Sequence, residues 1–542
     1  MSKKRYVDLD AMQYYESKWK LKFEELAIND DELDEICEEA INGIQEWSFT
    51  IDTRFVSQNN KKTGIPFNLY NQSESLRIDW GDGTSSRLTA ADYALTNTSA
   101  SLHEYENPGE YTITVKCLHY SNLYVLGTGN DTQYLNASDL SIVSLYWWRH
   151  TLKSVNNAIP LVKGMNRYRT FYSNRLEIFS DDLSYLFYQC YELSSVPQDL
   201  FEKNPSTSIF YRCFSKCSSL TSIPEKIFDK RTNSNCTFTL CFENCTSLSS
   251  IPEKLFYGIE IGNFNSCFSG CNSLASIPAE LFSNINGTSF ASCFCYCKQL
   301  TSIPANLFNS STNATSFNEC FSYCESLTSI PSNIFKFNTN VEDFSFCFSS
   351  CKRLQSLPAN LFNSPNATTF NGVFHGCESL TSIPGDMFAV AGENGRYFEY
   401  AFQLCNSLTS IPYDLFSENY YGENFEECFY GCRSITSIPS GLFPTLAQNF
   451  SGCFNGCTSL TTVPSDLFSG NYSVYSLEYL FDGCSSLRDF TLYIDSSNVD
   501  SAYGFVPYKS NVDRTVYVPA NSTTADTFND YAEEFGIAVV EV

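Results

Sequence analysis

The stretch Asn313-Ala314-Thr315-Ser316-Phe317-Asn318-Glu319-Cys320-Phe321-Ser322-Tyr323-Cys324-Glu325-Ser326-Leu327-Thr328-Ser329-Ile330-Pro331 is one copy of a phrase that decides the fold. The second cysteine of the phrase occurs twelve times, at intervals of 25–28 residues. These cysteines are Cys190, Cys217, Cys245, Cys271, Cys297, Cys324, Cys351, Cys377, Cys405, Cys432, Cys457 and Cys484. In eleven copies a proline follows seven residues later, from Pro197 to Pro464. A fixed period of this length predicts a solenoid in which each copy forms one coil.

The apolar residues of one copy predict how a coil folds. The set expected to point inward is Phe317, Cys320, Phe321, Cys324, Leu327 and Ile330. Its first four members are spaced as i, i+3, i+4 and i+7, which predicts one face of a short helix. The last two would point inward from a brief extended segment, which Pro331 ends by removing a backbone donor. A single copy cannot bury this set, so stacking would create the core.

The recurring phrase Phe-x-x-Cys-Phe-x-x-Cys-x-Ser-Leu-Thr-Ser-Ile-Pro-x-x-Leu-Phe resembles the BspA-like subclass of bacterial leucine-rich repeats. The resemblance covers roughly residues 181–490. It implies an α/β leucine-rich-repeat solenoid of about twelve coils, which would span roughly 50–60 Å at about 4.8 Å per stacked strand. The subclass is associated with surface adhesion and with recognition of proteins or glycans, so the resemblance implies binding without naming a ligand.

The chain has 24 cysteines, and most of them belong to the repeat. Eight lie four residues before a repeat cysteine: Cys213, Cys241, Cys267, Cys293, Cys320, Cys347, Cys428 and Cys453. In the other four copies this earlier position is Leu186, Val373, Ala401 or Leu480. The replacement of cysteine by aliphatic residues indicates a buried apolar site rather than a zinc ligand or a disulfide partner.

Residues 1–46 are expected to form a separate helical attachment segment. Glu24 to Glu39 contains nine acidic residues and no basic one, which fits either a charged helical hairpin packed on its neighbour or a docking segment. The stretch from Tyr6 to Lys20 resembles the N-terminal opening of many phage tail and fibre proteins from gut bacteria, with Ala11-Met12 where Gly-Leu is common. The resemblance implies that residues 1–46 bind other virion subunits.

Residues 47–117 show the alternation of an all-β domain. The stretch Trp80-Gly81-Asp82-Gly83-Thr84 is typical of a tight turn between two strands. This turn, His103, Tyr105 and the later stretch from Tyr111 to Val115 together make up one sequence pattern. This pattern resembles the PKD-type immunoglobulin-like β-sandwich, which implies a spacer or presenter. Asp79 and Asp82 could be read as a calcium pair, but the alternating ligands of a calcium loop are missing, so turn chemistry is the preferred reading.

The repeat is flanked by two segments that are expected to cap it. Residues 118–180 form a transition and N-terminal cap, in which Leu152 to Pro160 looks like a degraded copy. Residues 491–542 lose the period and form a C-terminal cap. In this cap we expect a strand at 515–519, a helix from Thr524 to Phe535 and a final strand at 537–542.

Composition limits the classes of function. The chain has 542 residues and a net charge of −26 at pH 7, which disfavours binding to nucleic acid or to an anionic membrane because both require a basic patch. No window of 18 apolar residues and no signal-peptide pattern occur, so we expect neither membrane insertion nor signal-directed export.

The sequence carries no recognisable catalytic motif. It lacks a phosphate loop, a Rossmann fingerprint, a Gly-x-Ser-x-Gly phrase and a His-Glu-x-x-His phrase. His375 lies near Cys377, but that cysteine is a core position of the repeat. We therefore expect a protein that is not an enzyme and that needs no cofactor or metal.

Positions that vary between copies are where ligand specificity is expected. The candidate ligand-binding residues are Arg396, Tyr397, Tyr413, Tyr420 and Tyr421. Aromatic faces suit stacking on sugars, although exposed loop tyrosines without a ligand would give the same pattern. The recurring Thr-Ser pair, such as Thr328-Ser329, would form ladders of hydroxyls that either pair across coils or contact a repetitive polysaccharide.

These features predict a non-enzymatic binding or structural protein. The preferred hypothesis is a phage virion component, a tail or fibre protein made in the host cytoplasm, whose solenoid recognises a glycan or protein of the bacterial surface. One alternative is a BspA-like adhesin on the bacterial cell surface, and a second is an intracellular scaffold. Self-association stays open.

Overall fold

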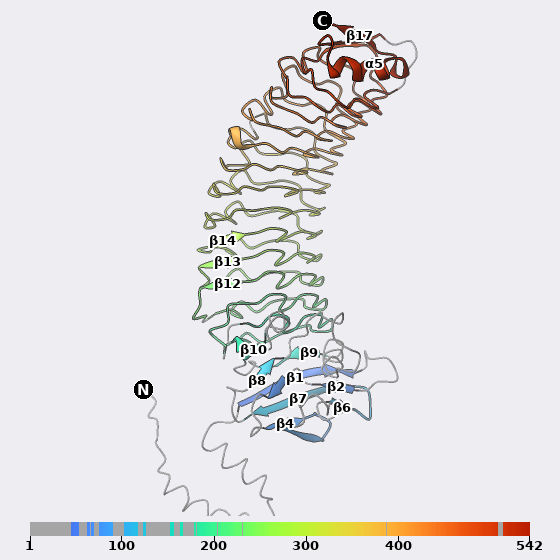
Figure 1. Cartoon of the computed structure of the whole chain (residues 1–542). Helices are drawn as coiled ribbons and strands as arrows, with labels where there is room; N and C mark the ends of the chain where they lie inside the picture. The colour runs from blue at the N-terminus through green and yellow to red at the C-terminus, as the bar shows by residue number, and fades with distance from the viewer. Residues whose placement is uncertain are drawn as a thin grey trace, which may run out of the picture.

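The computed structural model places a β-sheet unit at one end of a long, curved stack of coils, with a helical cap at the other end (Figure 1). It describes residues 45–53, 62–64, 67–69, 75–89, 102–117, 123–125, 152–156, 163–165, 178–179 and 182–542, except 203, 230, 386 and 508–512. The helical attachment segment expected at 1–46 lies outside the described residues, apart from its last two, which belong to a strand.

The N-terminal unit is built on a five-stranded antiparallel sheet of order β5-β4-β7-β1-β9. Its strands are β1 (Gln45–Asp52), β4 (Ser75–Asp79), β5 (Ser85–Thr89), β7 (Glu110–Cys117) and β9 (Leu152–Val155). Alternate residues of β1, namely Trp47, Phe49 and Ile51, are buried, as the period of two requires. The predicted strands are therefore confirmed, and the closed PKD-type sandwich stays a prediction.

Two smaller sheets accompany it. The pair β2 (Lys62–Gly64) and β6 (Leu102–Glu104) is antiparallel. A four-stranded sheet has the order β11-β10-β8-β3, from β3 (Phe67–Leu69), β8 (Leu123–Val125), β10 (Lys163–Met165) and β11 (Ile178–Phe179).

The residues of the PKD-like pattern meet at the turn between β4 and β5. Trp80 stacks on His103 with ring centroids 4.8 Å apart, and the Tyr105 hydroxyl donates to the carbonyl oxygen of Trp80 at 3.0 Å. His103 Nε2 lies 2.7 Å from Asp82 Oδ2. Asp82 Oδ1 also accepts the backbone N–H of Thr84 at 3.0 Å, so its carboxylate closes the turn, as the turn interpretation predicts.

Strand β9 joins the sheet unit to the stack. It pairs with β1 on one side, and on the other side Ser154 bridges Ser195 of the first coil. Two backbone hydrogen bonds, Val155 N–H to Ser195 O and Ser194 N–H to Lys153 O, tie the two together. The segment that looks like a degraded copy therefore connects the two parts through continuous backbone bonding.

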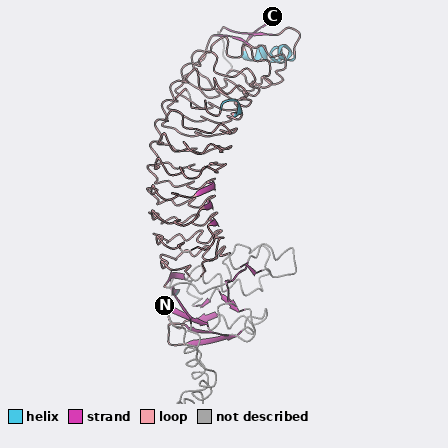
Figure 2. Ribbon diagram, turned by 90° about the vertical axis from the view of Figure 1, so that its left-hand side faces the viewer, coloured by secondary structure: helices cyan, strands magenta, loops and turns pink. Residues whose placement is uncertain are grey.

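The described residues of the coils form no α-helix, and the prediction of a helix from Phe317 to Cys324 is wrong. Figure 2 draws the coils almost entirely as loops, and the segment consists of two consecutive turns. Cys320 N–H donates to Phe317 O at 3.0 Å, and Cys324 N–H donates to Phe321 O at 3.3 Å. The residue before each cysteine is left-handed, with φ of 53° at Glu319 and 57° at Tyr323, and such a residue interrupts a right-handed helix.

This double turn recurs in all twelve coils. The left-handed residues are Tyr185, Gln189, Arg212, Lys216, Leu240, Asn244, Ser266, Gly270, Ser292, Tyr296, Glu319, Tyr323, Phe346, Ser350, Gly372, Gly376, Tyr400, Leu404, Glu427, Gly431, Gly452, Gly456, Tyr479 and Gly483. Only seven of these 24 are glycine. The same φ at non-glycine residues requires compensation from contacts between coils.

Hydrogen bonds between neighbouring coils provide that compensation. The backbone N–H groups that do not bond within a turn donate to the next coil instead. The N–H of Glu319 donates to Ser345 O at 2.8 Å, and the N–H of Tyr323 donates to Ser349 O at 2.7 Å. We name this repeated pattern the turn ladder. Because alternate amides bond within the coil and between coils, the turn satisfies its backbone without a helix.

A line of short parallel strands and single bridges runs beside the turn ladder. The strands are β12 (Asn235–Thr237), β13 (Ile261–Asn263) and β14 (Asn286–Ser289), and single bridges continue the line from Ser316 to Ser501. By contrast, the Thr-Ser segments bridge only at Ser329–Ser356 and Ser437–Thr462 among the described coils from 217 onward. The described coils therefore share a line of bridges along most of the stack, whereas their Thr-Ser segments form few bridges.

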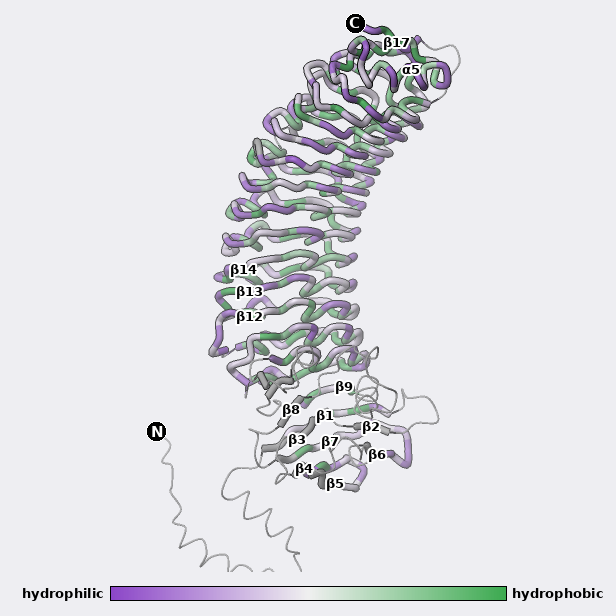
Figure 3. Tube along the Cα trace, viewed as in Figure 1, coloured by the Kyte–Doolittle hydropathy of each residue, from purple (hydrophilic) through white to green (hydrophobic). Residues whose placement is uncertain are grey.

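Ten of the twelve coils, from Phe210 to Phe468, give three phenylalanines to the stack, and these rings stack along the axis. Phe317 lies 5.4 Å from Phe290 of the previous coil with near-parallel rings, and Phe321 lies 5.7 Å from Phe294. Phe335 fills the space between columns, 4.7 Å from Phe317. Apolar and polar residues alternate along each coil (Figure 3), so only the stack as a whole encloses an apolar interior.

The repeat cysteine has a bonding role that explains why it is present in all twelve copies. In eleven coils its thiol donates to the carbonyl oxygen of a phenylalanine in the previous coil at 3.1–3.3 Å, as Cys324 does to Phe294. Cys320 is equally buried, and none of the described hydrogen bonds runs from its thiol to a carbonyl oxygen. The earlier position therefore accepts Leu, Val or Ala, as the apolar interpretation predicts.

The C-terminal cap follows the prediction closely. Strands β15 (Phe490–Tyr493), β16 (Arg514–Val518) and β17 (Ala538–Glu541) form a parallel sheet, and α5 (Thr523–Phe535) lies between the last two in sequence. Ser522 caps α5, and Gly536 ends it with φ of 62°. One 3-10 turn, η4 (Gly392–Asn394), interrupts the coils.

Candidate functional site

The last coils carry a surface in which tyrosines alternate with carboxylates. We name it the tyrosine–carboxylate face, and it consists of Tyr397, Glu399, Tyr400, Glu426, Glu427, Tyr475, Glu478, Tyr479, Asp500 and Tyr503. These residues lie on the bridge line or in the first turn of their coils. Their outward position follows from the backbone, since Phe398 is buried while Tyr397 and Glu399 on either side are partly exposed.

Side-chain amides from neighbouring coils hold the carboxylates in place. Asn424 Nδ2 donates to Glu399 Oε1 at 2.7 Å, and Asn449 Nδ2 donates to Glu426 Oε2 at 3.1 Å. The Tyr400 hydroxyl lies 3.5 Å from Glu426 Oε1. Each bond crosses from one coil to the next, so the register of the stack fixes the carboxylate positions.

Two carboxylates of the face, Glu399 and Glu427, lie in surroundings that disfavour their negative charge. Burial raises the pKa of Glu399, and the charge of Glu426 adds to the effect, while the amides of Asn424 and Asn371 offset part of it. Burial and the charge of Glu426 likewise raise the pKa of Glu427. A nearby positive charge would favour the ionised form of these two carboxylates.

The tyrosines of the face are available to a ligand. Tyr475 is 42% exposed and Tyr503 is 45% exposed, and the rings of Tyr479 and Tyr503 meet edge to face at 5.4 Å. Burial and the nearby Glu426 and Asp500 raise the pKa of Tyr475, so its ring lies in the field of those carboxylates. Tyr475 therefore lies close enough to carboxylates of neighbouring coils to interact with them electrostatically.

The structure brings together part of the predicted ligand-binding set. Arg396 Nη1 lies 2.7 Å from Glu423 Oε1, and its guanidinium lies 5.8 Å from the centre of the Tyr421 ring. Tyr397 belongs to the bridge line, between Thr369 and Asn424. Arg396, Tyr397 and Tyr421 thus cluster at one edge of the tyrosine–carboxylate face, with exposed Tyr420 next to Tyr421 in the chain.

Tyr413 stands apart from that cluster. It is 72% exposed and follows Pro412, on the opposite stretch of its coil from the bridge line. None of the ring or hydrogen-bond contacts among the described residues connects it to Arg396 or Tyr421. The structure therefore groups Arg396 with Tyr421 and leaves Tyr413 apart, and ligand binding by these five residues stays a prediction.

The Thr-Ser ladders have a structural use. Thr381 Oγ1 donates to Gln355 O at 3.2 Å, and Thr409 Oγ1 donates to Thr381 O at 3.4 Å. The hydroxyls thus bond to carbonyl oxygens of the previous coil rather than to one another. The hydroxyl donors of these two threonines are therefore in use, which favours the structural interpretation of the threonines over contact with a sugar.

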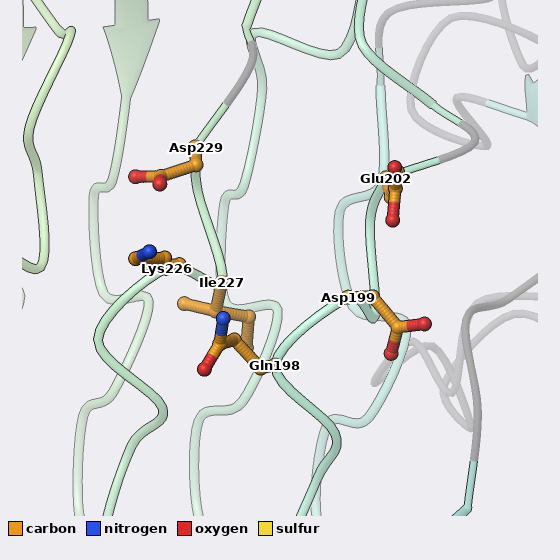
Figure 4. A pocket seen from close by; sticks show the side chains of 6 residues that line it. All are labelled: Gln198, Asp199, Glu202, Lys226, Ile227 and Asp229. Atoms are coloured by element: carbon orange, nitrogen blue, oxygen red, sulfur yellow. The ribbon is translucent and has the colours of Figure 1, made fainter.

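A hollow of about 230 Å³ lies between early coils and is lined by Gln198, Asp199, Glu202, Lys226, Ile227 and Asp229. Figure 4 shows the Asp199 carboxylate and the Lys226 ammonium pointing to different sides. The lining is shallow and mostly polar, with no convergent set of groups. We assign no ligand to it.

The buried thiols and the one repeat histidine give no catalytic pair. Burial raises the pKa of Cys377 to about 12, so its thiol is neutral at physiological pH. Burial lowers the pKa of His375, whose Nδ1 lies 3.2 Å from Ser349 Oγ rather than at a thiol. Within the described residues, no three His, Cys, Asp or Glu side chains are grouped as metal ligands.

In the described part of the chain, no helix combines the length and the apolar character that a membrane span requires.

Comparisons with known proteins leave the chain without an assigned family. No family model matches the sequence, and no curated protein matches it. A solved structure titled "Crystal structure of TLR13-ssRNA13 complex" aligns at 14% identity and a TM-score of 0.17, covering 66% of this chain and 53% of that chain. The alignment thus spans about half the length of that leucine-rich-repeat protein, and its low TM-score carries no argument about this chain.

Proposed function

We propose that the chain is a non-enzymatic recognition protein whose solenoid binds a partner through the tyrosine–carboxylate face. The observation that supports this proposal most is that hydrogen bonds between neighbouring coils hold the side chains of the face in place. One of them runs from Asn424 Nδ2 to Glu399 Oε1 at 2.7 Å. A preorganised surface loses little conformational freedom on binding. Core thiols such as Cys324 and threonine hydroxyls such as that of Thr381 bond within the stack, whereas the exposed rings of Tyr475 and Tyr503 offer aromatic surface to a partner.

We further propose that the chain is a phage virion component, in a tail or a fibre, that recognises a protein or glycan of the bacterial host surface. The support is the resemblance of Tyr6 to Lys20 to phage tail proteins, together with the acidic composition. In this proposal residues 1–46 attach to other virion subunits, the sheet unit acts as a spacer, and the leucine-rich-repeat solenoid presents the face.

Immunogold electron microscopy tests this function directly. An antibody to residues 180–490 is applied to cultures that produce the protein. Gold on phage tails or fibres is the expected result. Gold on the bacterial envelope would instead identify an adhesin of the BspA-like type, and gold confined to the cytosol would identify a scaffold and contradict the recognition of an external surface.

A further inference from the structure

We infer that the tyrosine–carboxylate face binds an extended basic segment, rich in lysine or arginine, of a partner protein. This inference rests on the proposed function and names the chemistry of the ligand.

The charge of the face is one-sided. It holds five carboxylates, from Glu399, Glu426, Glu427, Glu478 and Asp500, and no lysine or arginine. The adjacent Arg396 is paired with Glu423 at 2.7 Å, so it does not neutralise the face. Carboxylates in such proximity repel one another, and a cation between them removes that repulsion.

The tyrosines specify which cations fit. The face holds five tyrosine rings besides the five carboxylates, and Tyr400 and Tyr475 lie in the field of Glu426. A ring face attracts a guanidinium or ammonium within about 6 Å, and the structure already shows this geometry for Arg396 over Tyr421 at 5.8 Å. A ligand that offers several cations along a line would use both groups.

The spacing suits an extended peptide. The bridge line steps from Tyr397 through Asn424, Asn449 and Ser476 to Ser501, which is four steps. At about 4.8 Å per step the face is roughly 19 Å long, and an extended chain at about 3.3 Å per residue covers it with about six residues. A simple amine would use only one position of this surface, so a segment with repeated basic side chains fits better.

The test is a titration of the full chain with a fluorescent decalysine peptide, read by anisotropy at low ionic strength. The test variant is the triple substitution Glu399→Gln, Glu426→Gln and Glu427→Gln, which keeps side-chain shape. The control variant removes the same charge from exposed carboxylates elsewhere, by Glu225→Gln, Glu253→Gln and Glu280→Gln. Decaserine and decaglutamate peptides control for charge.

We expect the test variant to bind decalysine about tenfold more weakly or worse, and the control variant to bind like the parent chain. A second variant, Tyr475→Leu, should also weaken binding, because it keeps the charge and removes an exposed ring. Equal affinity of test and control variants would overturn the inference, as would the absence of decalysine binding by the parent chain. Neither result bears on the gold labelling, so the proposed function is judged separately.

Discussion

Replacing Gly456 by alanine should destabilise the coil if it forms the turn ladder and stabilise the coil if it forms a helix, so the sign of the stability change distinguishes the two structures. Gly456 precedes the repeat cysteine Cys457 and has φ of 73°. A Cβ built there would meet only Gly431 Cα at 3.5 Å, which is ordinary contact, so steric overlap adds nothing. The remaining term is the left-handed backbone, which costs a residue with a side chain roughly 1–2 kcal/mol.

A helix would give the opposite result. Alanine is favoured over glycine in a helix interior by about 0.8–1.0 kcal/mol, so Gly456→Ala would stabilise the coil if residues 450–457 were helical. The turn ladder predicts destabilisation of about 1–2 kcal/mol instead. The two accounts therefore differ by roughly 2–3 kcal/mol, well above experimental error.

The assay is native-state hydrogen exchange of the full chain, which reports local opening of individual coils. The turn-ladder amides of the neighbouring coil, such as Phe429 and Gly431, should exchange faster in Gly456→Ala, because their acceptors are Cys453 O and Asn455 O. Gly109→Ala is the control: it has no left-handed φ, and its Cβ would make ordinary contact with Tyr111 at 3.5 Å. Slower exchange in Gly456→Ala would refute the turn ladder.

Three further predictions concern other parts of the fold. Cys324→Ala should lower the free energy of unfolding by about 1 kcal/mol more than Cys320→Ala in urea titrations, because only Cys324 donates to a backbone carbonyl; equal effects would contradict the bonding role. Asn338→Leu should lower the free energy of unfolding by about 2 kcal/mol or more in the same titrations, because the buried Nδ2 of Asn338 donates to Phe308 O at 3.1 Å and to Ser311 O at 2.7 Å. An unchanged free energy of unfolding would show that water replaces the side-chain amide of Asn338. Burial would raise the pKa of Asp82, but hydrogen bonds from Thr84 and His103 outweigh burial and hold this pKa below 3.8, so the stability that they add is present above pH 3.8 and is lost as the pH falls through the lower pKa of the folded state. Asp82→Asn should therefore remove this acid-dependent loss of stability, measured by tryptophan fluorescence during unfolding. An unchanged acid profile in the variant would contradict this prediction.

The period of the cysteines was enough to predict the stack, and the cap at 515–542 was predictable from alternation and helix signals. The secondary structure of the coil was not. Spacing of i, i+3, i+4 and i+7 is met both by a helix and by two consecutive turns, because each turn also brings the fourth residue back to the interior. A signal was present in the sequence: glycine directly precedes the cysteine in copies such as Gly270-Cys271 and Gly456-Cys457, where a helix would disfavour it.

The candidate site was predictable only in part. Arg396 and Tyr421 were found because they break the repeat, but Glu399 and Glu426 did not stand out in so acidic a chain. Their importance comes from register: residues about 27 positions apart become neighbours only once the coil is closed. The same register separates Tyr413 from the others, since it lies past Pro412 on another side of the coil.

Carboxyl footprinting of the native assembly tests the central claim most directly. Particles or cell surfaces that carry the protein are isolated from producing cultures, labelled with a carbodiimide and an amine, and compared by mass spectrometry with the isolated chain. Binding through the tyrosine–carboxylate face predicts that Glu426 and Glu478 lose labelling in the assembly while Glu253 and Glu280 keep theirs. Unchanged labelling of Glu426 and Glu478, with protection elsewhere on the solenoid, would contradict the account.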